Sequence, residues 1–114
     1  MNTKGINLDL GKLRVDLVPP IVERAIATVL GESAAPKGKY PPRNWEKGMD
    51  WMRTYGSARR HELAWLGGED IDPESGLPHL WHILCRYGFL AEYERTGNGK
   101  DDRPGEVKTD ATTG

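Results

Sequence analysis

Acidic and histidine side chains gather between positions 61 and 82, and their oxygen and nitrogen atoms are of the kinds that bind divalent cations. Glu62, Glu69 and Asp72 lie at i, i+7 and i+10, with His61 flanking the first of them. At roughly 100° per residue, a helix continuing through all three positions presents the carboxylates on one face. Carboxylates at this spacing can chelate one hard cation or bridge two. These four residues are therefore candidate catalytic residues.

A second polar group follows a short turn. His79, His82 and Arg86 lie at i, i+3 and i+7 and share a face of the next predicted helix. The turn PESGLP makes the two helices antiparallel, which brings Glu69 and Asp72 close to both histidines. The predicted metal ligands are thus Glu69, Asp72, His79 and His82. Histidine suits Mn²⁺ better than Mg²⁺, and a neutral imidazole can instead serve as hydrogen-bond partner or general base. Both roles stay open.

Basic and aromatic residues alternate in the segment before this region. Lys39, Arg43 and Lys47 are interleaved with Trp45 in a stretch rich in proline and glycine. Phosphate charge and a stackable base both find partners in such a loop. Together with Arg86, these residues are the predicted substrate contacts. The alternative is that they merely cover the core.

Other interpretations of the same residues are available. Helical carboxylates in a chain with 29% charged residues often form a solvated face. Asp70, Asp72 and Glu74 are also typical of a calcium loop, but the glycine, Gly76, comes one place late and Trp81 holds the twelfth position. Cys85 is most simply a small buried apolar residue.

The elements that would position these residues are helices. Apolar periodicity predicts a first helix over residues 20–30, a second from about 49 or 50 to 66, and a third from 78 to about 95. Gly31 is expected to end the first helix, and the long connection after it is a loop. The fold class is all-α, a small helical bundle whose limited core is completed by homo-oligomerisation.

The expected domain organisation is simple. Residues 1–18 form an N-terminal arm with a short strand or turn around Leu13–Leu17, residues 19–95 form the domain, and residues 96–114 form a disordered tail. Such a bundle is expected to form a homodimer or homotetramer.

Composition excludes several classes of protein. A net charge of −1, from 16 basic and 17 acidic residues, removes the positive field of a protein that binds duplex nucleic acid. No apolar run approaches the roughly 20 residues needed to cross a bilayer, so no membrane partner is expected. A single cysteine and an N-terminus without an apolar core indicate a cytoplasmic protein.

Several segments together resemble a known family. They are LRVDLVPP at 13–20, RNWEKGMDW at 43–51, RRHELAWLGGEDIDPESGLPHLWH at 59–82 and FL at 89–90. The chain resembles the phage dATP/dGTP diphosphohydrolases, which are compact relatives of the MazG-type all-α nucleotide pyrophosphohydrolases. The resemblance implies a small MazG-like bundle.

The resemblance also bears on the ligands. In the MazG-like group an ExxE pair on one helix and an ExxD pair on the next hold Mg²⁺ against the triphosphate. Glu69 and Asp72 match the first pair, with Asp in place of the second Glu, whereas His79 and His82 occupy the best-placed positions for the second. Two arrangements follow: the histidines are ligands, or Glu62 joins the two carboxylates and the histidines orient water or phosphate.

The activity implied by the resemblance is hydrolysis of dGTP and dATP to the monophosphate and pyrophosphate. Two or more Mg²⁺ or Mn²⁺ ions would activate water and hold the triphosphate. Asn44 and Trp45 would contribute to the base pocket. Some similar phage enzymes accompany a pathway that replaces adenine with 2-aminoadenine in DNA, for which dGMP is the precursor, and would act in the host cytoplasm. The competing hypotheses are a non-catalytic nucleotide- or metal-binding module, a helical interaction module and, last, a calcium sensor.

Overall fold

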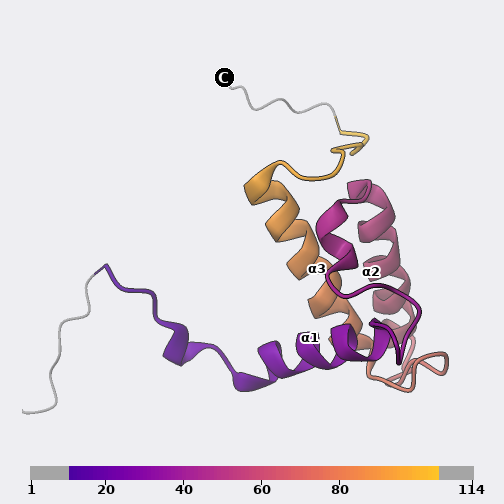
Figure 1. Cartoon of the computed structure of the whole chain (residues 1–114). Helices are drawn as coiled ribbons and strands as arrows, with labels where there is room; N and C mark the ends of the chain where they lie inside the picture. Colours follow the sequence, from indigo (N-terminus) through magenta and orange to yellow (C-terminus); the bar gives the residue numbers. More distant parts are fainter. Residues whose placement is uncertain (1–10, 106–114) are drawn as a thin grey trace, which may run out of the picture.

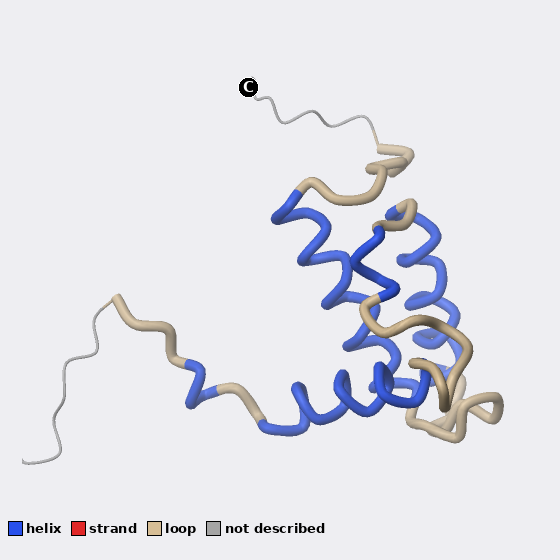
Figure 2. The backbone as a smooth tube through the Cα atoms, in the orientation of Figure 1, coloured by secondary structure: helices blue, strands red, loops and turns tan. Residues whose placement is uncertain are grey.

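The computed structural model describes residues 11–105 of the chain and is built from helices. Over these described residues, two short 3₁₀ helices, η1 (Val15–Leu17) and η2 (Asn44–Lys47), accompany three α-helices: α1 (Pro20–Ser33), α2 (Trp51–Leu66) and α3 (His79–Thr96). Within residues 11–105, β-type pairing is limited to isolated bridges, and the tube in Figure 2 shows helices and loops alone. The all-α prediction is confirmed.

The helices α2 and α3 form an antiparallel pair, and α1 lies across one end of it (Figure 1). This is the end at which α2 finishes and α3 begins, so the turn between them lies beside α1 in the picture. Residues 11–19 lead away from the bundle. The bundle therefore has a closed end, where the connection 67–78 lies, and an opposite end, where α2 starts and α3 finishes.

The core lies along α3. Val29 of α1 packs with Cys85, Phe89 and Tyr93 of α3 in one buried cluster. Trp45 of η2 covers this cluster by stacking on Phe89, with ring centroids 5.2 Å apart and planes inclined by 10°. Cys85 is fully buried, as predicted for a small apolar residue. The core is small because few side chains in the described part of the chain are fully buried.

Glycines affect the ends of α1 and α2 differently: α1 runs past its predicted end, whereas α2 ends where it was predicted to end. α1 continues through Gly31 to Ser33, because one glycine inside a helix costs only about 1 kcal/mol. α2 ends at Leu66, and Gly68 then takes a φ of +100°, which turns the chain out of the helical path. The predicted end at 66 is confirmed, and Glu62, Glu69 and Asp72 do not share the one face that a helix continuing past the glycines would have given them.

The segment after α3 also differs from its prediction. Residues 97–105, expected to be disordered, lie against the start of α2. The backbone N–H of Trp51 donates to the Lys100 carbonyl at 2.9 Å, and its indole Nε1 donates to the Asn98 carbonyl at 2.9 Å. Polar composition did not prevent order here, because these residues satisfy donors that the first turn of α2 leaves free. Positions 106–114 lie outside the described residues.

At the other end of the described chain, residues 15–17 form a 3₁₀ turn, in keeping with the turn predicted around Leu13–Leu17. The rest of the predicted arm, residues 1–10, lies outside the described residues. The domain limits 19 and 95 stay a prediction.

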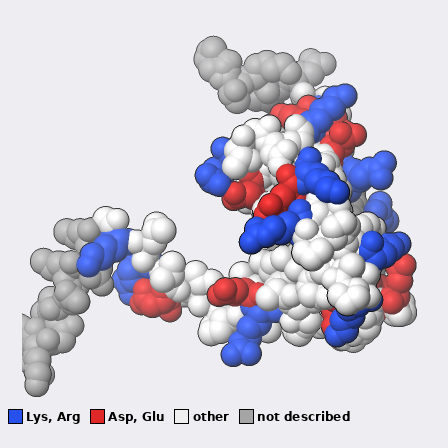
Figure 3. All heavy atoms as spheres, viewed as in Figure 1, with Lys and Arg blue, Asp and Glu red and all other residues white. Residues whose placement is uncertain are grey.

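The surface carries both signs of charge. On the face seen in Figure 3, Lys and Arg side chains alternate with Asp and Glu over the helical bundle. Among the described residues, none of the helices is both long enough and apolar enough to cross a bilayer.

Candidate metal centre

Three side chains from three successive parts of the chain meet at the closed end of the bundle. His61 comes from α2, Asp72 from the connection 67–78, and His82 from the first turn of α3. One nitrogen of each imidazole and one carboxylate oxygen all lie within 4.8 Å of one another. A divalent cation can bridge donors at such spacing with small side-chain adjustments.

The connection holds Asp72 in place by closing on itself. The Asp72 N–H donates to the Leu77 carbonyl at 2.9 Å, and the Gly76 N–H donates to the Asp72 carbonyl at 2.7 Å. Gly76 has a φ of +76°, a conformation that favours glycine, which explains its place in the turn. At the end of this turn, the His79 N–H donates to the Asp70 carbonyl at 2.9 Å. The carboxylate and the start of α3 are thus fixed together.

Ser75 links the carboxylate to one histidine. Its hydroxyl donates to Asp72 Oδ2 at 2.9 Å, and the same oxygen lies 2.7 Å from His82 Nε2. The direct separation between Asp72 Oδ2 and His82 Nε2 is 3.7 Å. The other carboxylate oxygen accepts the Glu74 N–H at 3.2 Å. Asp72 is therefore oriented by its own turn.

His61 is held by a different set of contacts. Its ring stacks on that of His82, with centroids 4.4 Å apart and planes inclined by 5°. His61 Nδ1 lies 2.8 Å from His79 Nδ1, and His79 Nε2 lies 2.8 Å from Glu69 Oε1. Glu69 therefore contacts His61 through His79. Because Nδ1 of His61 is engaged in this contact, Nε2 is the ring nitrogen that can bind an ion.

The electrostatics favour neutral imidazoles beside an ionised carboxylate. Burial lowers the pKa of His61 to about 4, with a smaller contribution from the neighbouring His82. Burial, followed by the charge of Arg86, lowers the pKa of His82. Burial opposes ionisation of Asp72, but hydrogen bonds from Ser75 and from the Glu74 N–H prevail and lower its pKa. Neutral imidazoles and an ionised carboxylate are the protonation states in which histidine and aspartate bind metal ions.

The donor set fits a divalent cation. His82 Nδ1 is buried and has no hydrogen-bond partner in the part of the chain that the structure describes. Buried polar atoms are nearly always paired, so the histidine network is incomplete without a further group. Imidazole donors suit Mn²⁺, Fe²⁺, Co²⁺ or Zn²⁺ better than Mg²⁺, which prefers an all-oxygen shell.

Of the four predicted ligands, Asp72 and His82 belong to the three-residue group, whereas Glu69 and His79 lie outside it. Glu69 and His79 contact each other and reach the group through His61. Sequence reasoning had His61 as a flanking catalytic residue and did not include Ser75. The local indication for Ser75 was its position three residues after Asp72 within a glycine turn, where side chains commonly bond to one another.

Glu62 lies apart from the three-residue group. Its carboxylate accepts hydrogen bonds from the Tyr87 hydroxyl and, at 2.7 Å, from Arg59 Nη1. The bond from Tyr87, then that from Arg59, lowers the pKa of Glu62, and the same contact with Glu62 raises the pKa of Tyr87 to about 12. The bond from Tyr87 ties α3 to α2, whereas the Arg59 pair lies within α2.

The predicted substrate contacts divide into two groups. Arg86 follows His82 by about one turn of α3, and its charge acts on both His61 and His82. Its Nε donates to Ser57 Oγ at 3.0 Å. Arg86 is therefore the predicted substrate contact placed beside the metal-binding group.

The other predicted substrate residues belong to the segment 34–50. Trp45 packs on Phe89 and Tyr93, and the Tyr93 hydroxyl donates to the Trp45 carbonyl at 2.6 Å. Tyr93 is eleven positions after His82, roughly 16 Å along the helix. The structure thus places η2 toward the opposite end of α3 from the histidines. Of the remaining members of this set, Lys39 lies over the ring of Tyr40 and Arg43 pairs with Glu46. Asn44 and Lys47 are the first and last residues of η2.

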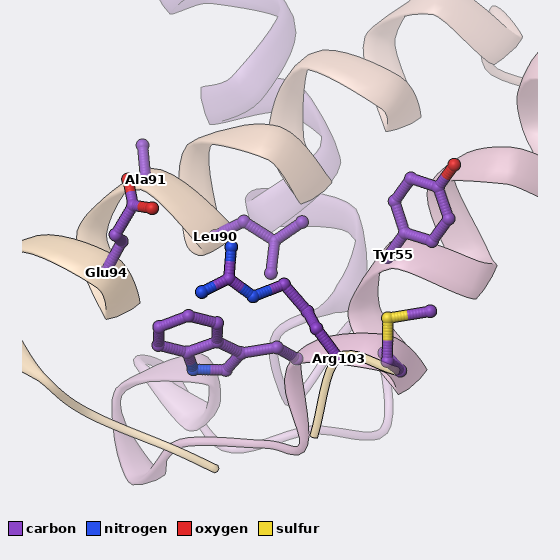
Figure 4. Close-up of a pocket in the computed structure, with 7 residues that line it drawn as sticks. Tyr55, Leu90, Ala91, Glu94 and Arg103 are labelled. Atoms are coloured by element: carbon purple, nitrogen blue, oxygen red, sulfur yellow. The ribbon is translucent and has the colours of Figure 1, made fainter. Parts of the chain in front are cut away.

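A mostly apolar hollow lies at that opposite end, between the start of α2 and the last turns of α3 (Figure 4). Its volume is about 290 Å³. The guanidinium of Arg103 lies 5.2 Å from the ring centroid of Trp51, and in the close-up the Arg103 side chain extends toward Leu90. The full lining is Trp51, Met52, Tyr55, Leu90, Ala91, Glu94 and Arg103.

Comparison with known proteins gives a consistent family. The family model described as "dATP/dGTP diphosphohydrolase, N-terminal" matches residues 2–103. A curated dATP/dGTP diphosphohydrolase of Salmonella phage PMBT28 is 31% identical over 99 residues, which is 87% of this chain. The chain spans about a third of the length of that relative, 33%. No solved structure matches the chain.

Proposed function

The chain belongs to the family of dATP/dGTP diphosphohydrolase N-terminal regions, and from that premise we propose that it hydrolyses dATP and dGTP with a bound divalent cation. The proposed products are the deoxynucleoside monophosphate and pyrophosphate. The observation that carries the proposal is the convergence of His61, Asp72 and His82 within 4.8 Å, with Arg86 beside them. Mn²⁺ or Mg²⁺ is the proposed cofactor, and the imidazoles favour Mn²⁺.

In this proposal the three residues hold the cation. When bound, a cation of this kind lowers the pKa of water and neutralises charge on phosphate oxygens. Asp72 supplies the negative charge, and His61 and His82 supply neutral nitrogen donors. Ser75 orients both Asp72 and His82 through its hydroxyl. Glu62 serves to join α2 and α3 rather than to move a proton, since Tyr87 and Arg59 occupy its carboxylate.

Arg86 is the proposed phosphate contact. Its guanidinium has five donors and is held against Ser57 by one of them, so others can reach a phosphate oxygen. The reaction adds the oxygen of one water to the α-phosphorus and breaks the bond from that phosphorus to the oxygen that leaves with pyrophosphate. One water proton is lost to solvent and the other remains on the phosphate products. Charge on the departing group makes a nearby cation and an arginine effective.

Three further parts of the proposal rest on sequence and surface alone. Kinship with the MazG-type pyrophosphohydrolases and a place in the 2-aminoadenine pathway, where dGMP is a precursor, rest on the sequence resemblance. Homo-oligomerisation, as a homodimer or homotetramer, rests on apolar side chains left exposed in the N-terminal segment and α1: Leu13, Val15, Leu17, Val18 and Ile21.

A non-catalytic cation- and nucleotide-binding module is the second candidate function. It is favoured by the length of the Salmonella phage relative, of which this chain covers 33%, because that relative has room for catalytic groups elsewhere. The same three residues would bind the cation in both cases.

Product analysis separates the two functions. The purified chain is incubated with each of the four dNTPs, with Mn²⁺, with Mg²⁺ and with chelator, and released pyrophosphate and phosphate are measured separately. The proposal expects pyrophosphate from dATP and dGTP, loss of it with chelator, and at least a 100-fold loss for Asp72→Asn, about 3 kcal/mol in the barrier. Glu74→Gln, an exposed acid two positions away, is the matched control. Binding without pyrophosphate release would favour the second candidate.

A further inference from the structure

We infer that Glu69 and His79 form a hydrogen-bonded relay that fixes the proton of His61 on Nδ1 and leaves the Nε2 lone pair available to a cation. The relay consists of two contacts, Glu69 Oε1 to His79 Nε2 and His79 Nδ1 to His61 Nδ1, each 2.8 Å long. This inference rests on the proposed function, because it assigns a role to residues around the same cation site.

The direction of each hydrogen bond follows from the atoms. An ionised carboxylate only accepts, so His79 Nε2 must carry a hydrogen and donate it to Glu69. In neutral His79 the other nitrogen, Nδ1, is then an acceptor. His61 Nδ1 must therefore donate to it, and the second nitrogen of His61 keeps an unshared lone pair. A single carboxylate thus sets the tautomers of two rings in series.

The fold holds this relay rigid. His79 is 4% exposed and is the first residue of α3, with its backbone N–H bonded to the Asp70 carbonyl. Glu69 follows the end of α2, and its N–H donates to the Ala64 carbonyl at 3.0 Å. His61 is fixed from its other face by stacking on His82. The rings therefore have little freedom to exchange partners.

The role differs from that of a ligand. Glu69 and His79 are positioning residues, because they act on the cation through His61. Groups that accept a hydrogen bond from a metal-binding histidine raise its basicity and fix its tautomer, and their removal typically lowers metal affinity about 10- to 100-fold. Here His79 is that acceptor, and Glu69 holds His79 in the accepting tautomer. This role explains why Glu69 and His79, although predicted as ligands, lie outside the group formed by His61, Asp72 and His82.

Nitrogen NMR of the histidine rings tests the relay directly and without metal. The chain has three histidines, so long-range ¹H–¹⁵N spectra of the full chain at neutral pH can assign each tautomer. The expected result is a hydrogen on Nδ1 of His61 and on Nε2 of His79, with loss of the fixed His61 tautomer in Glu69→Ala. A hydrogen on Nε2 of His61 in the unmodified chain would overturn the inference.

Calorimetric titration with Mn²⁺ alone, without nucleotide, tests its consequence. Glu69→Ala should weaken binding about 10- to 100-fold, whereas Glu69→Gln, which keeps an acceptor, should recover part of the loss. Glu74→Ala is the control, since it removes the same charge from an exposed position in the same turn. Equal affinity in Glu69→Ala and the unmodified chain, or equal losses in Glu69→Ala and Glu74→Ala, would overturn the inference.

The outcomes separate this inference from the proposed function. If the unmodified chain binds Mn²⁺ but the Glu69 variants bind it equally well, the relay fails and the cation site stands. If the unmodified chain binds no Mn²⁺, the proposed cofactor site fails, and the NMR tautomers decide the relay by themselves.

Discussion

The ring of His61, which is partly buried, stacks on that of His82, which is buried, and this setting favours uncharged rings. Two cationic imidazoles with centroids 4.4 Å apart would repel each other and would also lose hydration. Binding of a metal ion and stacking of the two rings therefore both require uncharged imidazoles. At lower pH both become unfavourable together.

This gives a prediction for stability in the presence of chelator. The pKa of His61 is lowered from 6.5 to about 4 in the folded chain, so between these values the unfolded chain binds a proton that the folded chain does not. The contribution of the uncharged His61 ring to the free energy of unfolding is therefore fully present above pH 6.5 and is lost as the pH falls toward 4. His82 adds to this loss, because its pKa is also lowered in the folded chain.

Urea denaturation at a series of pH values measures this effect. His61→Gln should show a shallower decline in the free energy of unfolding over that range than the unmodified chain. An equally steep decline in both proteins would contradict the assigned environment of His61.

Part of this grouping of side chains follows from the sequence alone. Glu69, Asp72, His79 and His82 were predicted to lie near one another, because a short turn joins their two helices. The joining of His61 to Asp72 and His82 could not be predicted, since it depends on how α2 is rotated against α3 and on the path of the turn between them. Trp45 shows the same limit: its type suits base stacking, but its position on Phe89 follows from tertiary packing.

At the scale of elements, α2 obtains its N-terminal cap from a distant part of the chain. Asp50 occupies the N-cap position without a side-chain hydrogen bond. Asp102 instead accepts the Met52 N–H through Oδ1 at 2.9 Å. A free helix donor is therefore satisfied by a residue fifty positions away.

Removal of this cap should destabilise the chain. Asp102→Ala is expected to lower the free energy of unfolding by about 1 kcal/mol, the usual cost of losing a capping carboxylate. Asp50→Ala is the matched control, because it removes the same charge at the same helix end without breaking a side-chain hydrogen bond. Thermal or urea unfolding of the three proteins gives the comparison, and equal losses in both variants would exclude a specific cap.

Sequence patterns predicted the helices themselves well and their ends less well. The second and third predicted helices match α2 and α3 within about two residues. The prediction for residues 97–105 was wrong because composition describes what a segment can bury by itself. Composition cannot show that N–H groups at the start of α2 are free to donate hydrogen bonds to Asn98, Lys100 and Asp102.

The bundle leaves much apolar surface uncovered at one side. Leu13, Val15 and Leu17 are 87%, 72% and 67% exposed, and they precede α1 in a segment that leads away from the α2–α3 pair (Figure 1). Exposed apolar side chains gathered in one segment commonly mark an interaction surface. A second copy of the chain is the occupant that the proposal assigns to it.

Sedimentation velocity tests this association. The chain should sediment as a dimer or tetramer rather than as a 12.7 kDa monomer. Leu17→Glu should shift the population toward monomer, because the new charge would have to be buried in the interface. Leu66→Glu, at an exposed apolar position on α2, should leave association unchanged. A monomer at all concentrations tested would contradict the proposal.

In the proposed function, His61 and His82 bind the cation together with Asp72. Pulsed electron paramagnetic resonance of the Mn²⁺-loaded chain, prepared with ¹⁵N-labelled histidine, detects nitrogen atoms bonded to the metal. Couplings from two imidazoles are expected, reduced to one in His61→Gln or His82→Gln and retained in Glu74→Gln. Bound Mn²⁺ without any histidine nitrogen coupling would contradict this proposal.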